Sequence, residues 1–349
     1  MKKKWLIISA VVLVVIALAV AVPVYIYMQN NYVAKVAGEK ISKSEYLFYL
    51  NGSKYEMESI QGITDENSRI EFWNTTSDGE TLKDTLKNNT LQRLKENKIL
   101  LIKAKENGTK LSSDDKDYIT QTIDYIVENN FGGKRIEADK ALKEQYGITL
   151  SKYENILADS ILIENFLYSE LDRLTPSDEE VSKYFEENKA DMDTVSVRHI
   201  LFMTVDSTTG ASLSENEIKA KEQKANEVKD RILAGEDMIA LVNELSEDPG
   251  KTSNQGLYTF NKFDSYLEEE FKEWALSAKV GDVGVVLTDT GYHVMRLEAR
   301  EPGTLEDTKD GITATLANEA LEKEMKEWFS DEKYNVDINE KVFDSINVI

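Results

Sequence analysis

The sequence predicts an α+β protein, in which a compact unit of strands and helices is attached to a mostly helical domain behind one N-terminal transmembrane helix. Three patterns predict this fold class. Residues 5–28 form an uncharged apolar run, residues 80–190 repeat apolar side chains at helical spacing, and residues 194–302 mix strand-like alternation with short helical stretches. The helical spacing resumes after residue 303, so we expect both ends of the chain to build the helical domain.

Composition narrows the possible functions. The chain of 349 residues has a formal net charge of -22, which argues against nucleic-acid binding because phosphate contacts need clustered lysine and arginine. Hydrophobic residues make up 41% and charged residues 30%, as in globular proteins rather than disordered ones. Cysteine is absent, which excludes disulfides, thiolate nucleophiles and the usual structural zinc sites.

The N-terminus has the pattern of a membrane anchor. Three lysines at positions 2–4 precede the apolar run, which is long enough to cross a hydrocarbon core of ~30 Å as a helix. Because lysine clusters stay on the cytoplasmic side, the rest of the chain is expected outside the cytoplasm. A cleaved signal peptide is the alternative, since residues 19–21 offer small side chains for cleavage. The apolar run continues beyond that point, which favours the anchor.

Residues 30–193 are expected to form one strand pair followed by amphipathic helices. The strand pair falls at residues 32–42, and Ser42 with Glu45 has the spacing of a capping box that begins the first helix. Ser177 with Glu180 repeats this spacing near the end of the block. Residues 52–80 have no clear period and are left unassigned. The apolar and aromatic side chains of the helices are interpreted as packing residues, with a groove for apolar segments of a partner as the alternative.

Residues 194–302 contain both histidines of the chain. His199 lies in a strand-like run at 195–203, and His293 lies in a second run at 291–297, each on the apolar face. The remaining elements follow a β-α-α-(β)-α-β-β order, with a helix capped by Ser214 and Glu217, a short helix after Asp237, a strand at 256–260, a helix at 267–275 and a strand at 285–288. The pattern describes a compact unit of about a hundred residues.

The two histidines have a structural and a functional interpretation. On spacing alone, they are either a hydrogen-bonded pair in the core or part of a site. A zinc site lacks supporting ligands, and no nucleophile-elbow pattern precedes either histidine, which argues against a Ser-His-Asp hydrolase. The acidic runs at 178–180 and 268–270 are interpreted as solvated surface, and calcium has no ordered ligand loop.

Residues 195–300 resemble a parvulin-type peptidyl-prolyl isomerase domain. The matching motifs are the Arg-His-Ile-Leu strand at 198–201, the Gly-Glu-Asp-Met stretch at 235–238, the Ser-Glu-Asp loop at 246–248 and the Gly-Tyr-His-Val-Met strand at 291–295. The flanking residues 33–38 and 175–185 resemble the chaperone domain of extracytoplasmic PrsA- and SurA-like foldases. The resemblance implies a four-stranded antiparallel sheet with helices at 194–302, an anchor at 1–29, and a chaperone domain made of 30–193 and completed by a helix and strand at 303–349.

The resemblance also implies a set of site residues. His199 and His293 would face each other on the floor of the active site, with Asp248 beside the rotating carbonyl and the hydroxyls of Thr288 and Thr290 hydrogen-bonded to the histidines. The apolar wall around the proline ring, with its neighbours, would comprise Leu257, Tyr258, Phe260, Leu267 and Phe271. Parvulins commonly have glycine at three positions where this chain has Asn254, Gln255 and Tyr258, and a tyrosine there narrows the expected cleft.

The function implied by the resemblance is that of a membrane-anchored foldase. It would isomerise Xaa-Pro bonds and chaperone unfolded or partly folded secreted proteins, without a metal or cofactor. The protein would be held by a single transmembrane helix in the cell membrane of a Gram-positive bacterium, with most of the chain on the outer side. A homodimer is one possible oligomeric state. The alternative is a holdase of the same architecture whose isomerase domain is inactive.

Overall fold

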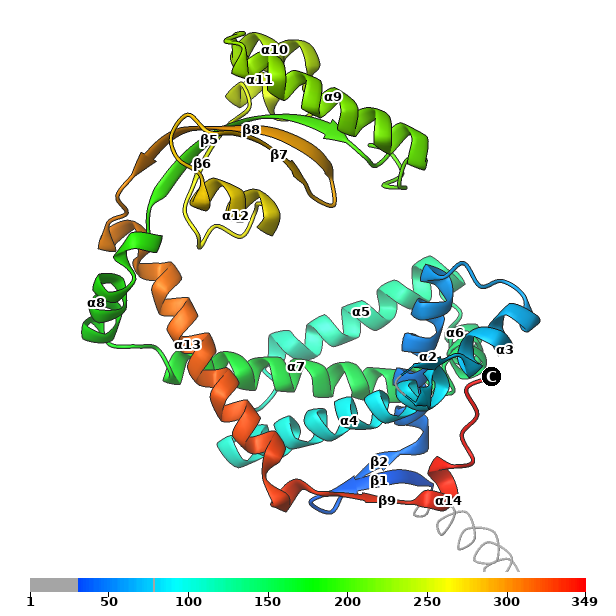
Figure 1. Cartoon of the computed structure of the whole chain (residues 1–349). Helices are drawn as coiled ribbons and strands as arrows, with labels where there is room; N and C mark the ends of the chain where they lie inside the picture. The colour runs from blue at the N-terminus through cyan, green and yellow to red at the C-terminus, as the bar shows by residue number, and fades with distance from the viewer. Residues whose placement is uncertain (1–30, 78) are drawn as a thin grey trace, which may run out of the picture. The chain divides into compact units, whose positions relative to one another are not determined.

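The computed structural model describes residues 31–77 and 79–349, which divide into two compact units (Figure 1). The first unit contains the described residues up to Arg173 together with Leu321–Ile349, and the second contains Leu174–Ala320. The expected domain limits at 193 and 302 stay a prediction. The expected anchor at residues 1–29 lies outside the described residues. In the part of the chain that the structure describes, no helix is long and apolar enough to cross a membrane.

The first unit combines a small sheet with long helices. The sheet has the order β2-β1-β9 and is antiparallel, with β1 at Tyr32–Val36, β2 at Glu39–Ser42 and β9 at Val336–Ile338. Ala34 pairs with Ile338, so the two ends of the described chain meet in one sheet. The helices are α2 (Lys43–Ile60), α3 (Glu66–Asn74), α4 (Leu82–Asn107), α5 (Ser113–Phe131), α6 (Arg135–Gln145) and α7 (Leu150–Arg173).

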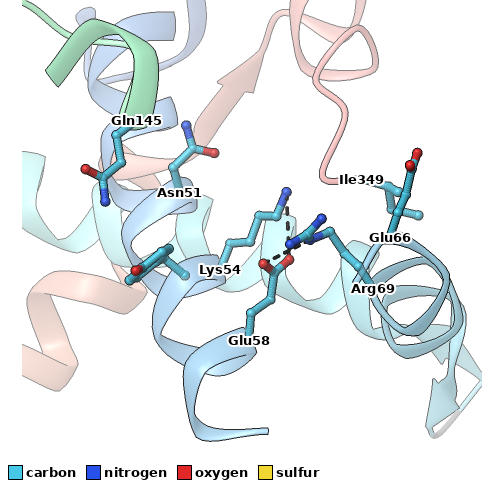
Figure 2. A pocket seen from close by; sticks show the side chains of 8 residues that line it. Asn51, Lys54, Glu58, Glu66, Arg69, Gln145 and Ile349 are labelled. Atoms are coloured by element: carbon cyan, nitrogen blue, oxygen red, sulfur yellow. Dashed lines mark hydrogen bonds and ion pairs between the residues drawn. The ribbon is translucent and has the colours of Figure 1, made fainter. Parts of the chain in front are cut away.

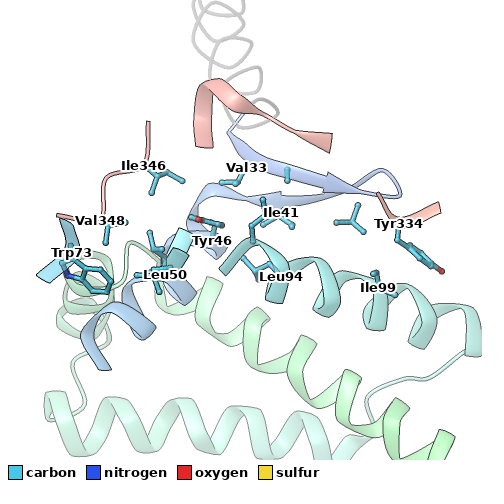
Figure 3. Packing of buried hydrophobic residues seen from close by; sticks show 14 residues of the cluster. Val33, Ile41, Tyr46, Leu50, Trp73, Leu94, Ile99, Tyr334, Ile346 and Val348 are labelled. Carbon is cyan, nitrogen blue, oxygen red and sulfur yellow. The ribbon is translucent and has the colours of Figure 1, made fainter. Parts of the chain in front are cut away.

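The main core of the first unit lies where the sheet meets α2 and α4 (Figure 3). Side chains from both ends of the chain fill it: Val33 and Ile41 from the N-terminal strands, and Tyr334, Ile346 and Val348 from the C-terminal tail, all buried. The C-terminal tail is therefore part of the core of the first unit, whereas its role in completing a chaperone domain stays a prediction. The previously unassigned residues 52–80 contain the end of α2, all of α3 and the start of a strand pair formed by β3 (Thr76–Ser77) and β4 (Glu80–Thr81).

A pocket of about 350 Å³ lies between α2 and α3 of the first unit (Figure 2). Glu58 is buried at its base and accepts a hydrogen bond of 2.7 Å from Nε1 of Trp73 and one of 3.1 Å from Nε of Arg69. The ammonium of Lys54 is 3.9 Å from the same carboxylate, and burial lowers the pKa of that lysine. These contacts hold α3 against α2.

The second unit contains the expected four-stranded antiparallel sheet, and its strand order is β6-β5-β8-β7. The strands are β5 (Thr194–Met203), β6 (Leu257–Phe260), β7 (Val283–Leu287) and β8 (Gly291–Glu301). One face packs on α9 (Glu215–Leu233) and α10 (Met238–Leu245), and the other on α12 (Glu269–Ser277) (Figure 1). The unit also contains α8 (Asp178–Glu187), α11 (Lys251–Asn254) and the first part of α13 (Leu305–Ser330). Short segments complete the described chain, with 3-10 turns at Lys189–Asp191 and Glu332–Tyr334 and a one-turn helix, α14, at Glu340–Phe343.

The capping expectations are mostly confirmed. Full capping boxes join Ser177 to Glu180 and Ser214 to Glu217. The expected box at Ser42 is only half formed. Its hydroxyl accepts the amide of Glu45, but the carboxylate of Glu45 is 2.9 Å from the ammonium of Lys98 instead. A buried carboxylate without a charged partner costs more free energy than an N-cap amide without a side-chain acceptor. Glu45 therefore pairs with Lys98 instead of closing the capping box.

Candidate active site

The two histidines meet in the middle of the second unit's sheet. His199 is on β5 and His293 on the neighbouring β8, where it pairs with Leu201, two residues beyond His199. Side chains two apart share a face, so both rings project from the α12 side of the sheet. Their Nδ1 atoms are 3.0 Å apart and the rings are stacked at 17°. Both histidines are buried, each 4% exposed.

Asp248 holds the His199 end of this pair. Its Oδ2 is 3.0 Å from Nε2 of His199, and its Oδ1 accepts the amide of Gly250 at 2.8 Å. The loop after α10 is fixed by Ser246, whose hydroxyl accepts the amides of Leu201 and Asp248. The loop is therefore tied to β5 itself, which places the carboxylate beside the histidine.

Thr288 holds the other end. Its hydroxyl is 2.9 Å from Nε2 of His293, as expected. The expectation for Thr290 is wrong, because its hydroxyl donates at 3.0 Å to Glu268 rather than to a histidine. The tight turn between β7 and β8 aims neighbouring hydroxyls in different directions, so only one of the two threonines reaches the ring. Glu268 itself was expected as solvated surface, yet its carboxylate lies 3.6 Å from Nε2 of His293.

The surroundings set the protonation of the site. The hydrogen bond with His199 lowers the pKa of Asp248 to about 2, with further lowering by the amide of Gly250 and the hydroxyl of Tyr258. Burial lowers the pKa of His293 to about 4, and the positive charge of a protonated His199 acts in the same direction. At neutral pH, Asp248 is therefore ionised and His293 is neutral.

One hydrogen arrangement satisfies these contacts when both rings are neutral. Ionised Asp248 only accepts, so Nε2 of His199 carries its proton and Nδ1 of His199 is a lone pair. Nδ1 of His293 must then donate to it, and Nε2 of His293 accepts from the hydroxyl of Thr288. The result is a directional chain of four groups running from Thr288 to Asp248.

Of the three altered glycine positions, Tyr258 lies directly against this chain. Tyr258 donates its hydroxyl to Oδ2 of Asp248 at 3.0 Å, and its ring packs edge-on against His199 at 5.1 Å. Gln255 adopts the left-handed conformation (φ 53°) that glycine accommodates without strain. The remaining glycine, Gly256, is required, because an added Cβ would lie 2.5 Å from the carbonyl oxygen of His199.

The expected apolar wall is assembled in part. Phe271 packs edge-on against both stacked histidine rings, with centroids 5.3 Å from each, and packs on Phe260 at 5.9 Å. Phe260 and Phe271 are each 2% exposed, whereas Leu267 and Tyr258 are half-buried and pack on the same cluster. Leu257 does not belong to the wall, because it pairs with Arg198 and so lies on the opposite face of the sheet from His199.

Two supporting residues were missed from the sequence: Ser246, which fixes the loop, and Glu268, which reaches the second histidine. Ser246 belongs to the Ser-Glu-Asp motif, but its spacing gives no sign of its bond to the distant Leu201. Glu268 has no local signal, since it acts on residues distant in sequence. Among the described residues, no group of three or more histidine, aspartate or glutamate side chains is placed to hold a metal ion.

Comparison with known proteins places both parts of the chain. Residues 1–167 match the SurA-like N-terminal domain, and residues 180–301 match the PPIC-type PPIase domain. A foldase protein PrsA from Caldanaerobacter subterraneus subsp. tengcongensis is 29% identical over 301 residues, covering 86% of this chain and 83% of the relative. A foldase protein PrsA from Clostridium botulinum is 26% identical over 311 residues, covering 85% of each chain.

A solved structure of foldase protein PrsA from Streptococcus pneumoniae covers 77% of this chain and 96% of its own, at 16% identity and a TM-score of 0.42, a likeness too low to support an argument. The family matches and the curated relatives agree with the resemblance seen in the sequence. The chain therefore joins a SurA-like N-terminal domain to a PPIC-type PPIase domain, and the relatives that it matches over most of its length are foldase proteins PrsA.

Proposed function

We propose that the second unit catalyses cis-trans isomerisation of Xaa-Pro bonds. The observation that carries the proposal is the hydrogen-bonded chain of Asp248, His199, His293 and Thr288 beside the aromatic cluster of Phe271. The hydrogen-bonded side chains form a rigid, polar surface, and the aromatic cluster forms an apolar surface beside it. This combination suits a substrate whose proline ring is apolar and whose reacting group is an amide.

The reaction breaks no bond, and the barrier is rotation about an amide of roughly 18–20 kcal/mol. Planar amides place more negative charge on the carbonyl oxygen than the twisted amide, which has lost its resonance. Asp248, ionised at neutral pH, disfavours that charge when the oxygen is close. The histidine pair and Thr288 hold Asp248 in place and need not transfer a proton. Leu267 and the edge of the Phe271 cluster support the proline ring.

A cis-trans exchange assay on an Xaa-Pro peptide tests the proposal. Wild-type chain should accelerate the exchange, and Asp248→Ala or His199→Ala should reduce kcat/KM by about tenfold or more, as expected for loss of an electrostatic contact. Asp230→Ala is the matched control, because it removes an exposed carboxylate on α9, on the other side of the sheet. Equal rates for the Asp248, Asp230 and wild-type chains would contradict the proposal.

The second candidate is a holdase whose parvulin-type domain is inactive. Tyr258 favours it, because its hydroxyl occupies Oδ2 of Asp248 and Asp248 is only 7% exposed. A substrate reaches the carboxylate only when the tyrosine moves. Wild-type exchange rates equal to those in buffer, together with retained binding of unfolded protein, would support the holdase.

We further propose that the first unit binds apolar segments of unfolded secreted proteins. A hollow of about 490 Å³ is lined by the rings of Phe48, Tyr49, Tyr146 and Tyr153, with Arg93 over the ring of Tyr49. A second hollow of about 320 Å³ follows α7 and is mostly apolar. Aromatic surfaces beside a few polar groups suit extended chains of varied sequence. The anchor at residues 1–29, which would hold the protein at the outer face of the membrane, and a homodimer are further proposals.

A further inference from the structure

Glu268 lies beside His293 of the candidate active site at the expense of a local helix contact. It is the N-cap residue of α12, but its side chain makes no cap hydrogen bond. Its Oε1 instead accepts the amide and the hydroxyl of Thr290, at 2.9 and 3.0 Å. N-cap side chains ordinarily satisfy the free amides of their own helix. The carboxylate is therefore held in a fixed position beside the turn that carries Thr288.

The second oxygen of this carboxylate faces the site. Oε2 of Glu268 is 3.6 Å from Nε2 of His293, beyond hydrogen-bonding distance, and that ring nitrogen already accepts from Thr288. The side chain of Glu268 is 32% exposed, against 9% for Asp248, both of whose oxygens are hydrogen-bonded. Of the two carboxylates, Glu268 is the one that a ligand can meet from solvent.

The negative charge of the Glu268 carboxylate is not neutralised by the lysines and arginines of the neighbouring segments. The loop at residues 204–214 and the turn at 288–291, which are joined by the amide of Thr204 and the carbonyl of Thr290, contain no lysine or arginine. The ammonium of Lys272, on α12, is 2.8 Å from Glu269, and that of Lys251, on α11, donates to the carbonyl of Ser246. Both cations are engaged by other groups.

We propose that Glu268 selects Xaa-Pro segments that carry lysine or arginine next to the proline and disfavours segments with acidic flanks. This inference rests on the proposed isomerase site. An ammonium or guanidinium beside the bound proline would donate to Oε2, whereas a flanking carboxylate would be repelled by it. Because the contact is partly exposed, one favourable pair changes the rate by roughly two- to fivefold, and salt reduces the difference.

The test measures exchange rates for three peptides, Phe-Xaa-Pro-Xaa-Ala, in which both Xaa residues are lysine, glutamine or glutamate. NMR exchange with the full chain at low salt gives kcat/KM for each. We expect the order lysine, glutamine, glutamate, with about tenfold between the extremes because attraction and repulsion add. Glu268→Gln keeps an acceptor for Thr290 and should reduce the spread to about twofold. Glu270→Gln, an exposed neighbour on the same helix, is the control and should keep it.

The failures of the two proposals can be told apart. Catalysis with equal rates on the three peptides, or a spread that Glu268→Gln leaves intact, overturns the selection by Glu268 and leaves the isomerase standing. Absence of catalysis on all three peptides overturns the isomerase. Peptide binding, followed by the ring signals of the two histidines, then decides the selection. Tighter binding of the lysine peptide that is lost in Glu268→Gln supports it, and equal binding or no binding overturns it.

Discussion

At the scale of single residues, the site is a line of groups whose protonation depends on its two ends. Oδ2 of Asp248 is hydrogen-bonded to Nε2 of His199, and burial keeps His293 neutral. The chain has only these two histidines, so their ring signals in an NMR spectrum report on this site alone. We expect the signal of His293 to titrate near pH 4. Titration near its ordinary value of about 6.5 would contradict the buried, neutral assignment.

The same shift predicts how stability depends on pH. Between about pH 6.5 and 4 the unfolded chain binds a proton at His293 that the folded chain does not, so stability falls as pH falls. One proton corresponds to a slope approaching about 1.4 kcal/mol per pH unit. Below about pH 4, Asp248 adds a further loss, because its folded pKa is about 2. Urea unfolding of the second unit should show its free energy of unfolding falling between about pH 6.5 and 4. His293→Gln should remove this dependence on pH.

Tyr258 gives a third prediction at this scale. Its hydroxyl must leave Asp248 before a substrate carbonyl can approach, and one net hydrogen bond is worth about 0.5–1.5 kcal/mol. Tyr258→Phe removes that bond and keeps the ring in its apolar contacts, so kcat/KM should rise by about two- to tenfold. Tyr266→Phe, which removes an exposed hydroxyl, is the control. A fall in activity would show instead that the hydroxyl contacts the substrate.

At the scale of elements, Gln255 and Gly256 lie where β6 approaches β5, and the two positions respond oppositely to substitution. Position 256 has no room for a side chain, whereas position 255 has a backbone conformation that favours glycine. The amide of His199 donates to the carbonyl of Gly256 at 2.8 Å, and a Cβ at position 256 would collide with β5. Gln255 has a left-handed backbone conformation, which is strained for any residue with a Cβ, and no packing requirement favours its side chain at this position. Gly256→Ala should therefore destabilise the second unit by about 2 kcal/mol or more. Gln255→Gly should stabilise it by about 0.5–1 kcal/mol, with Gln255→Ala near neutral.

Elements also show what the sequence could predict. The strands with His199 and His293 followed from alternation, and the boxes at Ser177 and Ser214 followed from local spacing, because both signals are set within a few residues. The misplaced residues depend on long-range geometry. The face taken by Leu257 depends on its pairing register with β5, and the direction of Thr290 depends on a turn and on Glu268. Such partners are distant in sequence and leave no periodic signal.

At the scale of the whole molecule, the first unit is built from both ends of the part of the chain that the structure describes. Ile346 and Val348 are buried in its main core, and β9 completes its sheet. Ile346→Ala should lower its stability by about 2–5 kcal/mol, as for other buried isoleucines. Ile60→Ala, at a residue 74% exposed in the same unit, should have little effect. The histidine signals of the second unit should persist in both variants, and their loss in Ile346→Ala would contradict the division into two units.

The same division predicts that the second unit can be removed without loss of the first. Arg173 ends α7, and its guanidinium is 2.6 Å from Glu324 on the part of α13 that belongs to the first unit. Deleting residues 174–320 therefore leaves two ends close together, and a flexible linker of about six residues spans roughly 12–15 Å.

We expect this shortened chain to fold and to suppress aggregation of a denatured protein, because the aromatic hollow lined by Phe48, Tyr49 and Tyr153 is intact. Light scattering of a diluted, denatured client measures the effect. The matched control is the same chain with Phe48→Ser and Tyr153→Ser, which makes the hollow polar and should weaken suppression severalfold while its circular dichroism is retained. If the shortened chain folds but suppresses no aggregation, binding of unfolded protein belongs to the removed residues, and the assignment to the first unit fails.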